Sequence, residues 1–258
     1  MTQALSVQEL AQLNARFERA HPSEIIRWAV EIFRQDVALT SAFGADSAAI
    51  IHMAVQVDPK ISIRTVDTGF LFPETQEFME ELRRRWSLNL QVVRTRLSEA
   101  EIARLKREHA TRPIDDRYCC GEYKREAAER ALAGLRGWIT GLMRVEAETR
   151  RQTPIIEQLS NGLVKIAPIA AWTRQQIDDY MREHQLPYHP LYAQGYLSVG
   201  CALHTQKPLD PQDPRSGRWG GQKTECGIHD IGKPRQTSPD GQGRSPRKGS
   251  KPPHQPKQ

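Results

Sequence analysis

Short apolar runs alternate along the chain with longer stretches in which apolar residues recur at helical spacing. Strands are predicted at 37–39, 61–69, 88–95, 137–143 and 164–169. Helices are predicted over 1–35 and about 47–57, from Pro73 to Arg85, from Ser98 to about Glu108, and over 173–186, with Thr173 as N-cap and Pro187 as stop. This alternation predicts an α/β domain with a parallel sheet, flanking helices and an irregular C-terminal segment.

Composition is that of a soluble globular protein, since 38% of the 258 residues are apolar and 26% are charged. The longest apolar run, at 48–57, is too short to span a bilayer. The first residues form an amphipathic helical pattern that carries Glu9, not a basic or cleavable leader. We therefore expect a cytoplasmic protein with no membrane partner.

Most of the net charge of +6 lies in a C-terminal tail. Residues 230–258 hold seven Lys or Arg and two Asp, so the tail carries +5 and residues 1–229 carry +1. A body with so little net charge is a poor candidate for nucleic-acid binding. The tail is rich in Pro, Gly and Gln and cannot bury enough apolar surface to offset its chain entropy, so we expect one domain over 1–229 and disorder after it.

Two strand ends carry candidate binding residues. TSAFGADS (40–47) links a strand to a helix, and its small residues let backbone N–H groups, with the Ser41 and Ser47 hydroxyls, approach an anion beside Gly44. No Gly-Lys-Ser/Thr follows, so it is not a Walker A loop. VDTGFLFPET (66–75) ends the next strand with Asp67, Thr68 and Gly69. Each segment alone is also compatible with an ordinary turn, but two neighbouring strand ends of this kind predict a nucleotide cleft.

Thiols and cations are grouped in three further segments. RYCCGEYKRE (117–126) places Cys119 and Cys120 before Lys124, and GLMRVEAETR (141–150) places Arg144 and Arg150 after a strand. PRSGRWGGQKTECGIH (214–229) brings Arg215, Arg218 and His229 close in sequence to Cys226. Arginines suit phosphate or sulfate, and nearby cations favour a reactive thiolate. Cys226 is therefore the candidate nucleophile, with an incidental exposed cysteine as the alternative.

In this combination the chain resembles the assimilatory adenylyl-sulfate (APS) and phosphoadenylyl-sulfate (PAPS) reductases. The resemblance runs in order over about 25–229 and includes TSAFGADS, VDTGFLFPET, the Cys pair followed by Lys, LPYHPLYAQGYLSVGC, RSGRW and KTECGIH. The segment ECG-x-H is highly specific to this family. The resemblance implies a PP-loop (adenine nucleotide alpha hydrolase-like) fold, with the nucleotide over the serine-rich turn and the Asp67 strand end.

The resemblance also implies a reaction. The Cys226 thiolate attacks the sulfur of the sulfonucleotide, the nucleotide leaves, and a thiol of thioredoxin or glutaredoxin then releases sulfite from S-sulfonated Cys226. Arg144, Arg215, Arg218 and Lys124 would stabilise the leaving phosphate, and His229 would orient the substrate or tune the thiol. The product serves cysteine biosynthesis. Some family members are homo-oligomers, and no interface can be read from this sequence.

One branch of the family holds a four-iron, four-sulfur (4Fe–4S) cluster on Cys-Cys and a later Cys-x-x-Cys. This chain has Cys119, Cys120 and Cys201, but His204 stands at the last position. Histidine ligates iron in Rieske centres, and three cysteines with one histidine also suit zinc. A cluster, a zinc ion and a site without metal therefore stay open. The paired cysteines favour adenylyl sulfate over its 3′-phosphorylated relative.

The 141–150 segment departs from the family pattern of an Arg pair followed by Asp-Gln-Ser. Met143 replaces the first Arg, and Val145, Glu146 and Ala147 replace the other three. A lost cation and an added carboxylate would weaken binding of a phosphosulfate. Two alternatives follow. One is a PP-loop enzyme that adenylates its substrate, and the other is a non-catalytic sulfonucleotide-binding redox sensor.

Overall fold

The computed structural model describes residues 5–111, 119–210, 212–221, 225, 228 and 231, without the side chains of 119–121. These residues form a six-stranded sheet of order β3-β2-β1-β4-β6-β5. Its strands are β1 (Val37–Thr40), β2 (Ser62–Asp67), β3 (Asn89–Arg94), β4 (Gly137–Thr140), β5 (Ile156–Gln158) and β6 (Val164–Ile166). All neighbouring strands are parallel except β5, which pairs antiparallel to β6.

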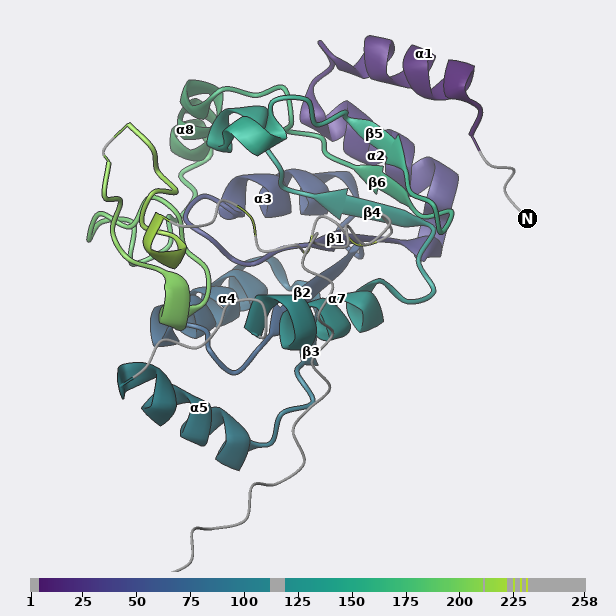
Figure 1. The fold of residues 1–258 in the computed structure, drawn as a ribbon. Coiled ribbons are helices and arrows are strands. Elements are labelled where there is room, and N and C mark those ends of the chain that lie inside the picture. The colour runs from purple at the N-terminus through teal and green to yellow at the C-terminus, as the bar shows by residue number, and fades with distance from the viewer. Residues whose placement is uncertain are drawn as a thin grey trace, which may run out of the picture.

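Longer helices separate the strands from β1 to β4, as Figure 1 shows. The longer helices of the chain are α1 (Val7–Phe17), α2 (Pro22–Phe33), α3 (Ala48–Val57), α4 (Pro73–Trp86), α5 (Glu99–Thr111), α7 (Arg125–Leu132) and α8 (Arg174–Glu183). Thr173 caps α8 as predicted, since its hydroxyl accepts a hydrogen bond from the backbone N–H of Gln176. Beyond α8, the described residues form two 3₁₀ helices, Ala202–His204 and Trp219–Gly221, so the predicted irregular segment is confirmed over this part of the chain.

The five predicted strands are confirmed, but two elements differ from the prediction. The strand β5 was not predicted and makes the sheet mixed instead of fully parallel. It forms a hairpin with β6, and Gly162 takes the positive φ of 85° that the connecting turn requires. The helix α7 was also not predicted, because charged residues dominate its sequence, REAAERAL.

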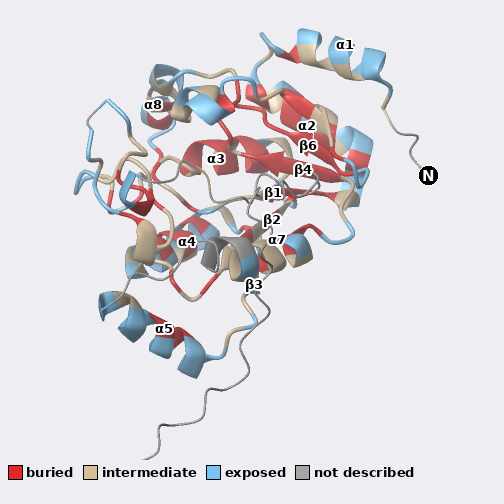
Figure 2. Cartoon of the chain, in the orientation of Figure 1, coloured by how far each residue is buried: buried red, intermediate tan, exposed pale blue. Residues whose placement is uncertain are grey.

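The two faces of the sheet are covered differently. On one face α2, α3, α4 and α8 bury a large apolar core, which contains Leu39 of β1 and Ile63 of β2. The other face packs against α7 through a smaller cluster around Trp138. Figure 1 shows α3 and α7 on opposite sides of β1 and β2. Figure 2 shows that the central strands β1, β4 and β6 and the inner sides of α2 and α3 are buried, whereas the outer sides of α1 and α5 are exposed.

The topology marks one position at the edge of the sheet for a ligand. From β1 the chain continues to β2 and β3 on one side, and later returns to β4 on the other side of β1. In open α/β sheets, ligands bind beyond the carboxyl ends of the strands where the order reverses in this way. The segments that follow β1 and β4 are therefore the place to look for the site.

None of the helices in the described part of the chain combines the length and the apolar character needed to cross a bilayer. The predicted boundary at residue 229 and the predicted disordered tail fall in a part of the chain of which the structure describes only Ile231.

Candidate functional site

A cavity of about 390 Å³ lies at the carboxyl ends of β1 and β4, on the side of the sheet that α7 covers. Thr40, Thr140 and Trp138 face it because alternate residues of a strand point to opposite faces, and Leu39 and Ile139 therefore point into the large core. The Trp138 ring is held by a hydrogen bond of 2.7 Å from its Nε1 to Thr40 Oγ1. The cavity has a volume typical of small-molecule sites.

The serine-rich turn after β1 forms one wall of the cavity, and Ser41, Gly44 and Ser47 all line it as predicted. Ser41 Oγ accepts a hydrogen bond of 3.0 Å from the N–H of Phe43, and Ser47 Oγ donates one of 3.0 Å to the Gly44 carbonyl. Phe43 has a φ of 49° and is almost fully buried, which anchors this tight turn. The two serine hydroxyls therefore shape the turn in addition to lining the cavity.

Only one of the three candidate residues at the end of β2 lines the cavity. Thr68 lines it, and its buried Oγ1 has no hydrogen-bond partner among the described residues. Asp67 instead accepts a hydrogen bond of 2.8 Å from the N–H of Gly69 and pairs with Arg94. Gly69 has a φ of 78° and packs so closely against Ile102 that a Cβ would lie 2.4 Å from its Cδ1. The structure thus assigns Asp67 and Gly69 to the turn and leaves Thr68 to face a ligand.

Cations converge on the cavity from several elements. The lining includes the predicted Lys124, Arg150, Arg215 and Arg218, and also Arg64 and Arg174, which the sequence analysis did not single out. Arg218 is 5% exposed, packs over Trp219 at 4.7 Å, and its Nε has no hydrogen-bond partner among the described residues. Buried donors of this kind are normally satisfied, so Arg218 and Thr68 indicate a polar ligand.

Arg144 was predicted beside these cations, and the structure does not bring it to the cavity. It follows Met143, which is 1% exposed in the large core, and its guanidinium points the other way. Arg144 donates a 2.8 Å hydrogen bond to the Thr153 carbonyl and forms an ion pair with Glu18, the residue that follows α1. Its position serves the contact between α1 and the loop before β5.

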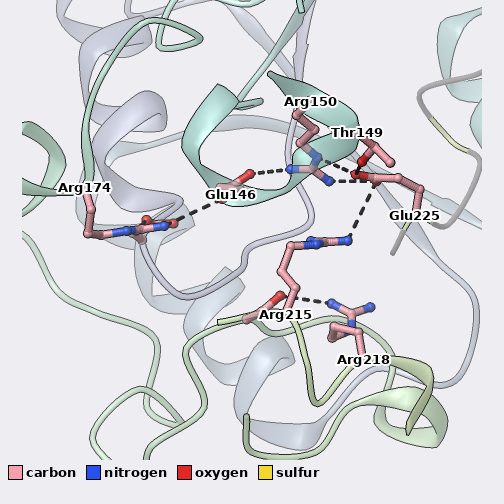
Figure 3. A network of polar contacts seen from close by, with 9 residues as sticks. Glu146, Thr149, Arg150, Arg174, Arg215, Arg218 and Glu225 are labelled. Carbon is pink, nitrogen blue, oxygen red and sulfur yellow. Dashed lines mark hydrogen bonds and ion pairs between the residues drawn. The ribbon is translucent and has the colours of Figure 1, made fainter. Parts of the chain in front are cut away.

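Three carboxylates join the arginines in one network, which Figure 3 shows around Arg150. Arg150 donates to Glu225 through Nε at 2.6 Å and Nη2 at 2.9 Å, and through Nη1 to Glu146. Arg174 pairs with Asp46 and lies 3.8 Å from Glu146. Glu146 therefore lies between two guanidinium groups.

Burial and charge act differently on these carboxylates. Burial raises the pKa of Glu146 above its ordinary value, and the charge of nearby Arg150 opposes the rise without cancelling it. Burial also disfavours the charged form of Glu225, but hydrogen bonds from Arg150 and its charge outweigh that effect and hold the pKa of Glu225 below its ordinary value. Of the two, Glu146 is the group nearer to taking up a proton.

The predicted nucleophile Cys226 and its companion His229 lie outside the described residues. Two of their neighbours in the chain are described. Glu225 is bound by Arg150 and lies 3.7 Å from Arg215, and Ile228 lines the cavity.

The predicted metal ligands are only half described, because the side chains of Cys119 and Cys120 are not. Cys201 Sγ lies 3.6 Å from His204 Nδ1, and the His109 ring of α5 meets the His204 ring edge-on. This separation fits a thiol–imidazole hydrogen bond or two ligands of one tetrahedral metal ion, for which bond lengths give roughly 3.6 Å. Ligands of a four-iron cluster bind different irons and lie farther apart. Among the described residues, no three His, Cys, Asp or Glu side chains are grouped to hold a metal ion. The cluster and its four ligands remain a prediction.

The arrangement suits a ligand with an apolar ring and a strongly anionic group. Apolar side chains from α7 and the neighbouring strands, such as Leu132 and Val66, line the same cavity as the cations. Six lining cations face Asp46 and Glu146 of the lining and the adjacent Glu225. This surplus of positive charge in a partly closed site favours an anion with several negative charges.

Comparison with known proteins agrees with this chemistry. A family model described as the phosphoadenosine phosphosulfate reductase domain matches residues 36–207. An adenosine 5′-phosphosulfate reductase of Mesorhizobium japonicum is 40% identical over 222 residues, which are 85% of this chain and 86% of that protein. A phosphoadenosine 5′-phosphosulfate reductase of Xanthomonas campestris is also 40% identical, over 88% of this chain and 95% of that protein.

Solved structures support the predicted PP-loop fold. The phosphoadenylyl-sulfate reductase of Candida auris, in a phosphate complex, superposes with a TM-score of 0.68 and 28% identity, covering 78% of this chain and 98% of that one. The Candida glabrata FMN adenylyltransferase shares the fold alone, with a TM-score of 0.54 and 14% identity over 87% of this chain and 80% of that one. The predicted fold and the predicted class, an oxidoreductase acting on a sulfur group, are confirmed, and the chain belongs to the phosphoadenosine phosphosulfate reductase family.

Proposed function

We propose that this protein reduces adenylyl sulfate to sulfite and AMP through an S-sulfocysteine on Cys226, in the assimilation of sulfate for cysteine biosynthesis. One observation carries the proposal. Glu225, which precedes Cys226 in the chain, is held by two hydrogen bonds from Arg150 in the wall of the cationic cavity. Ile228, two residues after Cys226, lines the same cavity. Residues on both sides of Cys226 in the chain thus contact the cavity that suits the substrate.

The reaction balances in two steps. The Cys226 thiolate attacks the sulfur of the sulfonucleotide, an S–S bond forms, the S–O bond to the phosphate breaks, and AMP leaves with that electron pair. A thiolate of thioredoxin or glutaredoxin then attacks Cys226 Sγ, and sulfite leaves with the electrons of the S–S bond. The second thiol of the reductant resolves the mixed disulfide. The reductant is oxidised to its disulfide and the sulfur is reduced from sulfate to sulfite.

The cavity residues take separate parts in this reaction. Arg215 and Arg218 bind the phosphosulfate, where negative charge grows on the leaving phosphate, and Lys124 adds a third cation. Thr68 donates its unpartnered hydroxyl to the nucleotide. The apolar wall formed by Leu132 and Val66 packs against the adenine. His229 orients the phosphosulfate or tunes the thiol.

Adenylyl sulfate is proposed as the preferred substrate because of the paired Cys119 and Cys120. Phosphoadenylyl sulfate, which would give adenosine 3′,5′-bisphosphate, is the alternative, and relatives at equal identity carry both names. Sulfite release is measured from each nucleotide with thioredoxin and then with glutaredoxin. A higher kcat/KM for adenylyl sulfate supports the assignment, and a higher value for phosphoadenylyl sulfate reverses it.

Replacement of the nucleophile tests the mechanism. The variant Cys226→Ser is expected to release no sulfite from either nucleotide while it still binds adenylyl sulfate. Mass spectrometry of the unchanged chain, mixed with adenylyl sulfate and no reductant, should show an added sulfonate on Cys226. Sulfite release by Cys226→Ser contradicts the mechanism. Binding without sulfonate transfer by the unchanged chain favours the non-catalytic redox sensor instead.

The metal prediction is tested separately. Cys119, Cys120, Cys201 and His204 are proposed as ligands of a four-iron cluster, although the 3.6 Å between Cys201 Sγ and His204 Nδ1 must lengthen if the two bind different irons. No step of the proposed reaction passes through the cluster. Protein purified without oxygen should be brown and contain about four irons per chain. Zinc, or no metal, in that protein contradicts the cluster.

A further inference from the structure

Among the described residues, Glu146 is the acidic side chain that contacts two cations of the cavity from within its lining. Its Oε2 accepts a hydrogen bond from Arg150, and its Oε1 lies 3.8 Å from Arg174 Nη2. The side chains of Glu146 and Arg150 are 20% and 10% exposed, so solvent screens their charges poorly. A carboxylate in this position does what a bound anion would do.

We propose that Glu146 is an affinity-setting residue of the substrate site, which competes with the sulfonucleotide for Arg150 and Arg174. The inference rests on the proposed function, since it assumes that the cavity binds a sulfonucleotide. A phosphosulfate that enters the cavity adds negative charge beside Glu146. That charge either displaces the carboxylate from the two arginines or draws a proton onto it.

Every charged group described around Glu146 fits this role. Arg150 faces it from the same loop, Arg174 from the start of α8, and Arg215 from the segment before the second 3₁₀ helix. Asp46, from the turn before α3, is the nearest like charge, and Glu225 occupies the far side of Arg150. Asp46 pairs with Arg174, and Glu225 pairs with Arg150 and Arg215. Glu146 also pairs with arginines, but burial raises its pKa, whereas the pKa of Glu225 is lowered. Added negative charge raises the pKa of Glu146 further and favours its protonation.

The direction of the pH dependence follows from linkage. Bound substrate raises the pKa of Glu146 further, so binding takes up a proton while the pH lies between the pKa of the free protein and that of the complex. Affinity for the sulfonucleotide is then highest below the lower pKa and falls as the pH rises through this window. Above the window it levels off at its weakest value. The two charges of adenylyl sulfate belong to strong acids and do not titrate in this range.

The test measures binding of adenylyl sulfate to full-length protein between pH 5.5 and 9, with Cys226→Ser in every variant so that no sulfonate is transferred. Glu146→Gln keeps the size and one acceptor oxygen for Arg150, but carries no charge. We expect this variant to bind about tenfold more tightly at pH 8.5, and we expect this difference to shrink as the pH falls. The ratio of the two dissociation constants cancels other titrating groups, including His229, because both proteins carry them.

Glu148→Gln is the matched control. It removes the same charge two residues away, from an exposed carboxylate that pairs with exposed Arg151. We expect less than a twofold effect at any pH. In protein that retains Cys226, Glu146→Gln should lower KM for adenylyl sulfate at high pH and leave kcat within about twofold, the pattern expected for binding alone.

The opposite result identifies a different role. If Glu146→Gln binds adenylyl sulfate more weakly, or if the ratio of dissociation constants does not change with pH, Glu146 only positions Arg150 and the inference is overturned. Failure of the proposed function gives another pattern. In that case the protein with Cys226 releases no sulfite, while the binding ratio can still rise with pH and support the role of Glu146 in an anion site.

Discussion

The two faces of the sheet use opposite chemistry. On the face covered by α2, α3, α4 and α8, buried side chains are almost all apolar, from Leu39 on β1 to Met181 on α8. On the other face, beyond the carboxyl ends of β1 and β4, arginines and carboxylates fill the wall of the cavity. The first face stabilises the fold by burying apolar area. The second face holds charged side chains in a place where their desolvation costs free energy. Such charges are expected where a protein must bind a charged ligand.

The difference between the faces appears within six residues of one loop. Arg150 contributes to the cavity network, whereas Arg144 lies outside it on Glu18. Both arginines pair with carboxylates, so ion pairing alone does not distinguish a binding residue from a structural one. Burial distinguishes them better, since the side chain of Arg150 is 10% exposed and that of Arg144 is 25% exposed.

The largest expected effect comes from removing the central cation. Arg150→Met leaves Glu146 and Glu225 without their shared partner in a poorly solvated site. We expect a loss of about 3 kcal/mol in the free energy of unfolding, the lower end for broken buried pairs because the two carboxylates are 20% and 25% exposed. Urea unfolding measures it. Sulfite release should also fall, since Glu225 loses its anchor beside Cys226.

Arg144→Met is the control for that variant. It removes the same charge from the same loop, but its partner is half exposed, and we expect a loss below about 1 kcal/mol. Sulfite release should stay within about twofold of the unchanged chain. Equal losses of unfolding free energy in the two variants would show that the cavity network stabilises the fold no more than the exposed ion pair does.

The apolar face has its own titratable group, which gives the next largest effect. His189 is 1% exposed and lies edge-on to Phe78 of the large core. Its Nδ1 accepts a hydrogen bond of 3.1 Å from the N–H of Leu191, so its Nε2 carries the proton and donates to Thr75 Oγ1 at 2.9 Å. Burial lowers the pKa of His189 to about 4.

Because the unfolded chain binds a proton at His189 more readily, stability is full above about pH 6.5 and falls as the pH drops towards 4. His189 should therefore lower the free energy of unfolding by about 2 kcal/mol when the pH falls from 7.5 to 5. Urea unfolding of the unchanged chain and of His189→Gln, at both pH values, measures the difference. A pH dependence that persists in His189→Gln would assign the acid sensitivity to other groups.

Periodicity predicted the elements that carry many apolar residues and missed those that carry few. The five predicted strands and the helix after Thr173 are present because each pattern repeats over enough residues to be read. The three residues of β5 hold too little pattern, and their pairing depends on the turn at Gly162. The helix α7 has a charged sequence, and its four buried positions are identified only by contact with β2 and β3.

Site prediction failed where partners are distant in sequence. Ser41, Thr68, Arg215 and Arg218, which line the cavity, could be singled out from sequence because their segments combine strand ends, small residues and cations. Arg174 and Asp46 were missed because they are 128 residues apart and form an ion pair only in the folded chain. From sequence alone, a charged residue at the start of a capped helix, such as Arg174, is interpreted as an ordinary surface residue. For the same reason Arg144 and Arg150 could not be separated from sequence, since their directions depend on the burial of Met143.

The smallest expected effect concerns a glycine that fits Arg218 into the cavity wall. A Cβ on Gly200 would lie 2.1 Å from Arg218 Nη2 and 2.6 Å from its Cζ, so Gly200→Ala must move the guanidinium. Arg218 also contacts Ser198 at 3.5 Å and Trp219, which limits where it can go. We expect binding of adenylyl sulfate to weaken about tenfold, which corresponds to about 1.4 kcal/mol.

A double-mutant cycle with Arg218→Ala shows whether the displaced guanidinium causes this loss. Once Arg218 is truncated, the new methyl group has room, and Gly200→Ala should change the dissociation constant by less than about twofold. If the two substitutions instead weaken binding additively, the methyl group acts on the ligand or on the backbone, and Arg218 is not the residue that Gly200 accommodates. This coupling is a more specific test of the site than a large loss of affinity, because it links one glycine to one cation of the charged face.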